Sequence, residues 1–515
     1  MSSSKKIDII CIAMAVLALV ITLLFMNGEA LGLKTVVDED AEENSDLVYF
    51  TRNDLNGNWN TSVATKIVLK DDKVKIAGSG AIVKNGNVVI NSGGHYVVNG
   101  SLTDGSIIID AKSGAKVWLL FDGVEINRND DACIKVSNAD KVFLTLAEDS
   151  LNSLTSGAVY NEEALAEGVD GAIYSHDDFT INGSGSLSVK ADYKHGIAVN
   201  DALVITGGSI TVSAVSGAIH ANENLRICNA TLNLSSQNKG IVVKDPESYF
   251  YLESGKINIT VSKDAINTEG DVNIIGGEVS ISAGDDGIHS EKSINISGGK
   301  LSLLSCYEGL EAPDVTISGG DVVIYPTKNG VSTKYKATET TEETTNENEE
   351  KSVAETSPEN TTETSAESKA LPEFKMSGGS LTITNTEDKT DGIDSDGNVV
   401  IDGGKIRICL NGNGNNNAVE FGTENGGSFL INGGDVLMTA GAVKQEKPSA
   451  ASAQKYLFKK LRIVPAGTNI SLTDAGGKTI SEATPEAAFC NIIISHPDLN
   501  SQDGCKLYID GELIQ

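Results

Sequence analysis

The sequence predicts an all-β fold, a right-handed parallel β-helix whose coils hold about 22 residues each. With 515 residues the chain is too long for one ordinary compact core, so a fold that grows in one dimension is favoured. The 53 Gly, 9 Pro and abundant Ile, Val, Ser and Asn suit short strands separated by turns. A fixed repeat of Asp-Gly-Ile and Ile-Ser-Gly-Gly supplies the third observation.

The first 46 residues predict attachment to a membrane. Lys5 and Lys6 precede an apolar run long enough to cross a bilayer as a helix, and no small-residue cleavage site follows. We therefore expect an uncleaved signal anchor over residues 1–30, with the lysine side in the cytoplasm and the rest of the chain outside the cell. If the segment is cleaved, the protein is secreted. Residues 31–46 are acidic and predict a short stalk.

Residues 47–445 are assigned to the β-helix. Gly276, Gly298 and Gly319 mark the same turn in consecutive coils, at spacings of 22 and 21 residues. A β-propeller would need about twice that period. Stacked coils bury an inner ladder of Ile, and the glycines are expected to supply positive φ at the corners.

Two segments depart from the repeat. Residues 336–370 hold almost only Thr, Glu, Ser, Asn, Lys and Ala, and predict a disordered loop that leaves the solenoid between two coils. Residues 446–515 contain strands without the coil period. A solenoid needs its open end covered, so this segment is expected to form a C-terminal β cap.

Several stretches resemble a known family, the clostridial carbohydrate-binding β-helix proteins. They are residues 93–102, 117–126 and 139–147, the repeats that follow, and residues 493–499, in that order. The resemblance covers the chain from about residue 50 to its end. It implies a pectate-lyase-like β-helix that binds cellulose or acidic plant sugars with the help of calcium and has no established cleavage activity.

Aligned coils place a column of polar residues two positions before each inward Ile. It includes Asp264, Asp286 and Glu308, then Asn329, Asp391 and Asn417. Stacked carboxylates repel one another, and oxygen-only ligands suit calcium. Corner turns are the alternative role for Asp and Asn, but turn preference does not explain Glu308. The predicted metal ligands are Asp264, Asp285, Asp286 and Glu308, then Asp391, Asp394 and Asp396, and finally Asp170, Asp177 and Asp178.

The net charge of −31 argues against a nucleic-acid partner. Aromatic residues make up 5% of the chain, and Trp59 and Trp118 are expected to pack in the core of the early coils. The leading hypothesis is a monomeric, calcium-dependent cell-surface protein that binds cellulose or polygalacturonate. A calcium-dependent polysaccharide lyase and a structural or adhesive surface protein are the alternatives. No catalytic residue is assigned.

Overall fold

The computed structural model describes residues 49–335 and 370–514, except residues 72, 386–387, 389, 413–415, 442–445 and 502–503. The predicted anchor, the stalk and nearly all of the 336–370 insertion lie outside the described residues. Among the described residues no helix is long and apolar enough to cross a membrane. The chain divides into two compact units, Met1–Asn56 and Gly57–Gln515. In the first, α2 (Arg52–Leu55) begins with a capping box between Thr51 and Asp54.

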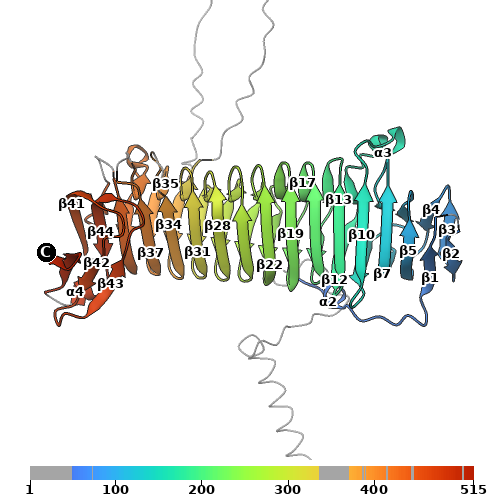
Figure 1. The fold of residues 1–515 in the computed structure, drawn as a ribbon, viewed down its shortest axis with the longest axis horizontal. Helices are drawn as coiled ribbons and strands as arrows, with labels where there is room; N and C mark the ends of the chain where they lie inside the picture. The colour runs from blue at the N-terminus through green and yellow to red at the C-terminus, as the bar shows by residue number, and fades with distance from the viewer. Residues whose placement is uncertain are drawn as a thin grey trace, which may run out of the picture. The chain divides into compact units, whose positions relative to one another are not determined.

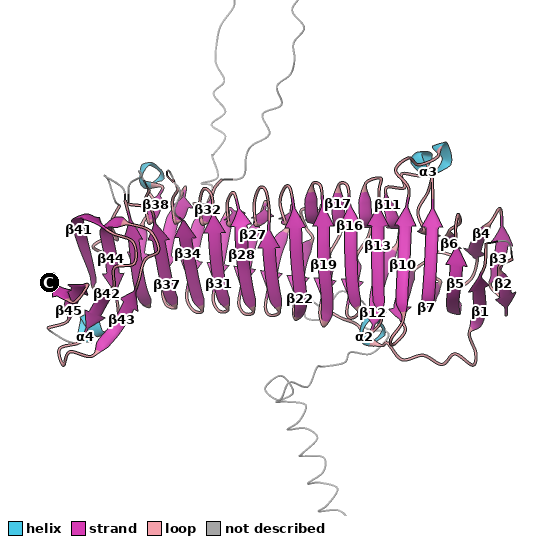
Figure 2. Cartoon of the chain, viewed as in Figure 1, coloured by secondary structure: helices cyan, strands magenta, loops and turns pink. Residues whose placement is uncertain are grey.

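The second unit is a β-solenoid of about 12 turns, in which helices are few and short (Figure 1, Figure 2). A regular coil contains three strands, and each strand pairs in parallel with the corresponding strand of the next coil. Ile288 pairs with Leu310, and Ile294 pairs with Val315. This pairing confirms the parallel solenoid predicted from the repeat, while its right-handed sense stays a prediction. One such coil consists of β26 (Ile288–Ser290), β27 (Ser293–Ile296) and β28 (Lys300–Cys306).

One face of the solenoid is a 14-stranded sheet, and it carries the candidate site. In three consecutive strands of this sheet the first residue points inward, where Ile266, Ile288 and Leu310 are fully buried, and the next residue points outward. In pairing order its strands are β3 (Ala81–Lys84), β4 (Asn87–Ile90), β6 (Ile107–Asp110), β8 (Ile134–Asn138), β11 (Gly171–Ser175), β14 (His195–Val199), β17 (Gly217–Ala221), β20 (Lys239–Val243), β23 (Ile266–Thr268), β26, β29 (Leu310–Ala312), β32 (Val331–Thr333), β35 (Ile393–Ser395) and β38 (Val419–Phe421).

The two glycines of each Gly-Gly turn serve different purposes. Gly299 has φ +80°, the left-handed conformation that glycine adopts without strain. Gly298 has no positive φ, but a Cβ there would lie 2.3 Å from the carbonyl oxygen of Ile275 in the preceding coil. The expectation of positive φ is therefore right for the second glycine, whereas close packing of successive coils explains the first.

The coils on either side of residues 336–369 pair directly with each other. β31 (Asp321–Pro326) pairs with β34 (Ser380–Asn385), and β32 pairs with β35. The inserted segment therefore leaves the register of the stack unchanged.

Antiparallel strands occur at both ends of the solenoid. At the C-terminal end, β44 (Phe489–Ser495) pairs antiparallel with β40 (Asp435–Ala440) and with β41 (Tyr456–Val464). A separate four-stranded antiparallel sheet packs there, formed by β42 (Ile470–Thr473), β43 (Thr479–Ala483), β45 (Lys506–Ile509) and β46 (Glu512–Leu513). At the other end, β1 (Thr65–Leu69) forms a hairpin with β2 (Lys75–Ala77), an arrangement that the repeat analysis did not predict.

Candidate cation site on the 14-stranded sheet

Two columns of polar side chains run side by side along the 14-stranded sheet. The corner column is the one predicted from the repeat, and it lies where each coil enters the sheet. The strand column consists of the outward residues that follow each inward Ile, and it was not predicted from the repeat. The alternation of inward and outward residues in a strand could have revealed it. The strand column runs through Asn267, His289, Glu311, Ser332, Asp394 and Glu420.

The corner column holds successive coils together. Oδ1 of Asp264 accepts a hydrogen bond from the backbone N–H of Asp286 (3.4 Å), and Oδ1 of Asp286 accepts one from the N–H of Glu308 (3.2 Å). Asn329 does the same for the N–H of Asp391 (3.1 Å). These side chains therefore make corner contacts, the role weighed against metal binding in the sequence. A carboxylate that accepts one such bond keeps its second oxygen for another partner.

Asp264, Asp285 and Asp286 form a compact group of acids. One carboxylate oxygen from each lies within 4.8 Å of the others. Lys239 contacts Asp264 at 3.0 Å, and Lys263 contacts Asp285 at 3.2 Å. Burial and the nearby carboxylates raise the pKa of Asp286 to about 6. Three hard oxygen donors at this spacing fit calcium, which takes six to eight oxygen ligands.

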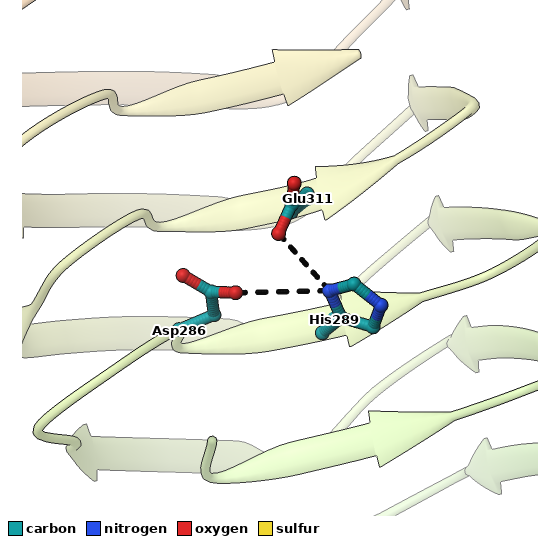
Figure 3. Close-up of side chains that lie close together, drawn as sticks. All are labelled: Asp286, His289 and Glu311. Atoms are coloured by element: carbon teal, nitrogen blue, oxygen red, sulfur yellow. Dashed lines mark hydrogen bonds and ion pairs between the residues drawn. The ribbon is translucent and has the colours of Figure 1, made fainter. Parts of the chain in front are cut away.

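His289 lies between the carboxylates of two coils (Figure 3). Its Nδ1 is 3.0 Å from Glu311 and 3.6 Å from Asp286, and its Nε2 is 3.2 Å from Glu291. Burial alone would lower the pKa of His289, but the bonds to these three acids raise it to about 10. The bond to His289 in turn lowers the pKa of Glu311 to about 2. In the group formed by Asp286, His289 and Glu311, the imidazolium of His289 therefore supplies the positive charge that a metal ion would otherwise supply.

Glu308 is the most buried acid of the corner column, with 2% of its surface exposed. Its Oε1 contacts Lys328 at 2.9 Å and Lys334 at 3.3 Å. Its Oε2 is buried and has no hydrogen-bond partner among the described residues. A buried carboxylate oxygen without a partner is costly, so this atom is available to a bound ligand.

The predicted ligands around residue 394 do not form a group of their own among the described residues. Burial raises the pKa of Asp391 to about 7, and Asp394 accepts a bond from Asn329 Nδ2 at 2.9 Å. Asp396 accepts the backbone N–H of Tyr335 at 3.3 Å. In the described ranges, the ligand atoms of these three acids do not come together within 4.8 Å.

The third predicted group is also not assembled. Asp170 lies 3.8 Å from His195, and burial raises its pKa. Asp177 accepts the backbone N–H of Ala139 (2.8 Å), while Asp178 accepts that of Ala202 (3.1 Å). The latter two side chains thus hold corners of neighbouring coils.

An aromatic stack occupies the outer surface of the early coils. Trp118 is half-buried and lies between His95, with ring centroids 4.7 Å apart, and Phe143, at 5.4 Å. The ring planes are within 7° of parallel. Trp118 therefore packs outside the core, contrary to expectation. Both of its faces are covered, so it offers no free platform for a sugar ring.

Comparison with known proteins places this solenoid in a family. The model of the family described as carbohydrate-binding domain-containing protein matches residues 84–330 and 263–414, together more than half of the chain. A carbohydrate-binding domain-containing protein of Acetivibrio thermocellus is 38% identical over 154 residues, which are 30% of this chain and 54% of that relative. The match thus spans about half of the relative's length.

A solved structure, the gadolinium derivative of a polysaccharide lyase-like protein from C. thermocellum, is also similar. It shares 32% identity over 45% of this chain and 96% of that chain, with a TM-score of 0.44. The extent of the family match, which runs through both columns of the 14-stranded sheet, decides the assignment: the chain belongs to the carbohydrate-binding domain-containing protein family.

Proposed function

We propose that the protein binds an acidic polysaccharide at the cell surface through calcium held by Asp264, Asp285 and Asp286. The convergence of these three carboxylates within 4.8 Å is the observation that carries the proposal. The side chain of Asp285 is 37% exposed, so an ion bound there keeps positions open towards solvent. A sugar carboxylate can fill those positions.

Charge explains why a cation is needed. The chain has a net charge of −31 and repels a polyuronate at long range. Calcium between protein carboxylates and sugar carboxylates removes that repulsion where the two surfaces meet. This reasoning favours polygalacturonate over cellulose, which has no carboxylates to share the ion. Membership of a carbohydrate-binding family supports a sugar ligand of either kind.

The apolar run near the N-terminus supports the cellular location. Lys5 and Lys6 precede it, as in a signal anchor, and the acidic residues that follow suit a solvated stalk. We propose that this segment tethers the solenoid to the outer side of the membrane, within reach of polysaccharide.

Binding without cleavage is favoured by the state of the nearby lysines. A lyase needs an unprotonated base beside the bound uronate. Lys239 and Lys263 instead pair with acids, and the bond to Glu308 raises the pKa of Lys328. A lysine whose amine is engaged by a carboxylate is a poor base. Absence of an absorbance rise from unsaturated uronates would agree with this reading, and a calcium-dependent rise would favour the lyase.

Pull-down of the full chain on polygalacturonate and on insoluble cellulose, each with calcium or with a chelator, tests the proposal. We expect retention on polygalacturonate with calcium and its loss in chelator. D285N should weaken retention at least about tenfold, because the exposed ligand is lost. D192N is the matched control, since Asp192 is also an exposed acid paired with a lysine. Equal retention in chelator, or an unaffected D285N, would contradict the calcium bridge.

A further inference from the structure

Two histidines from successive coils face each other at a place to which neither the family nor the proposed function assigns a role. His195 begins β14, and His220 lies in β17. Nε2 of His195 is 3.2 Å from Nδ1 of His220. Asp170, one coil earlier, has a carboxylate oxygen 3.8 Å from the same Nε2. The two imidazoles thus meet directly, and Asp170 lies near one of them, although the ligand atoms of all three residues do not come within 4.8 Å of one another among the described residues.

The surroundings hold the His195 ring in place. His195 is 8% exposed, whereas His220 and Asp170 are half-buried and remain open to solvent. In the next coil along the chain, Gly217 pairs with His195, and a Cβ at Gly217 would lie 2.8 Å from Nδ1 of His195. Glycine therefore makes room for the imidazole. This Nδ1 is buried and has no hydrogen-bond partner among the described residues.

Burial favours the neutral form of both rings. Burial and the charge of Lys194 lower the pKa of His195 to about 4. Burial and His195 lower the pKa of His220 to about 4 as well. Neutral imidazole is the form that binds metal, so no proton has to be displaced from a charged ring. This state contrasts with His289, which three acids hold in the charged form.

The spacing of the two nitrogens matches the separation of two ligands on one ion. Imidazole nitrogens about 2.0–2.1 Å from a tetrahedral ion lie roughly 3.3 Å apart. We propose that His195 and His220 bind a divalent transition-metal ion such as zinc, with Asp170 as the third protein ligand. Asp170 lies somewhat farther away and turns towards the ion as its partner Lys194 is displaced.

Displacing Lys194 from Asp170 costs little free energy. Lys194 lies 3.9 Å from Asp170, and its side chain is half exposed, so the ion pair contributes little. The remaining position of a tetrahedral ion would face solvent next to His220. Nitrogen donors favour zinc, copper or nickel over calcium, so this site is chemically distinct from the Asp264–Asp285–Asp286 group.

Calorimetric titration of the metal-stripped full chain with zinc, in excess calcium, tests the proposal. Calcium occupies the oxygen sites, so we expect saturable binding of one zinc ion. Cobalt bound in its place should show the visible absorption of a tetrahedral nitrogen and oxygen site. The variant H220N should bind zinc at least about tenfold more weakly, because changes in the second shell alone cost 10–100-fold.

The variant H220N is suitable because Asn267 occupies the corresponding position two coils later in the same sheet. H176N is the matched control, since His176 is an exposed histidine near Asn200. D170N, which keeps the shape of the side chain, should weaken zinc binding to a smaller extent. Absence of saturable zinc binding, or wild-type affinity in H220N, would show that the two histidines share only a hydrogen bond.

Discussion

The carboxylate of Asp286 accepts a hydrogen bond from the backbone N–H of Glu308, the residue at the same position of the next coil (3.2 Å). The same side chain belongs to both groups of potential metal ligands. Asp286 therefore has two roles: it accepts a hydrogen bond that joins successive coils, and it is a potential ligand of a cation. Substitutions of Asp286 can separate these two roles.

We expect D286N and D286A to differ. D286N retains an oxygen that accepts the Glu308 N–H but loses the charge, so stability should change little while calcium affinity falls at least about tenfold. D286A leaves the N–H without its acceptor and should lose about 1–3 kcal/mol of unfolding free energy. Denaturant unfolding and calcium titration measure the two effects. Equal calcium affinity of D286N and wild type would exclude Asp286 as a ligand.

The ion pairs of His289 should make stability depend on pH. The pKa of His289 is about 10 in the folded chain, against 6.5 for an unperturbed histidine. Its contribution is therefore fully present below pH 6.5 and is lost as the pH rises towards 10. The stability difference between wild type and H289N should shrink over that range. E311Q, which removes one acid partner, should move the loss to lower pH, and a pH-independent difference would contradict the pairing.

Gly309 should tolerate no side chain. A Cβ there would lie 2.3 Å from the carbonyl oxygen of Gly330 and 2.5 Å from Ile324. G309A should therefore destabilise the solenoid by about 1–3 kcal/mol or more, as overpacking does. Gly114 is the matched control, because no atom lies within 4 Å of its Cβ position and its φ is not positive. Denaturant unfolding of both variants measures the difference, and equal stabilities would contradict the close packing of coils.

The aromatic stack around Trp118 should contribute to the stability of the fold and not to sugar binding. W118A removes two ring contacts, each of about 0.5–1.5 kcal/mol, and should lower the melting temperature. Retention on polygalacturonate should stay unchanged, because His95 and Phe143 cover both faces of the ring. A loss of retention without a loss of stability would reveal a sugar contact at Trp118.

The repeat predicted the parallel stack because inward Ile residues recur at nearly constant spacing, and only coil-on-coil pairing buries them. It also predicted the corner column, since Asp264, Asp286 and Glu308 stand at the same place in each repeat. The hairpin of β1 and β2 lies outside the repeat, so periodicity gave no signal for it.

The partners of the acids were harder to predict. Lys328 and Lys334 flank Asn329 and the strand after it, yet both reach back to Glu308 in the preceding coil. The length and direction of a lysine side chain decide that contact, and spacing along the sequence does not encode them. Likewise, the sequence does not show that His289 lies beside Glu311, because only the register of the two strands brings them together.

The direct pairing of the coils around residues 336–369 has a consequence for folding. Ile324 pairs with Ile383, 59 residues away, whereas the register elsewhere joins residues such as Ile266 and Ile288, 22 apart. By loop-closure entropy this longer closure costs only about 1 kcal/mol more, so the finished stack is hardly weakened. During folding, however, every other step along these coils is local, and this one is not. We therefore expect the coils before and after this junction to fold as two separate blocks. The two blocks should pair with each other late in folding and separate early in unfolding.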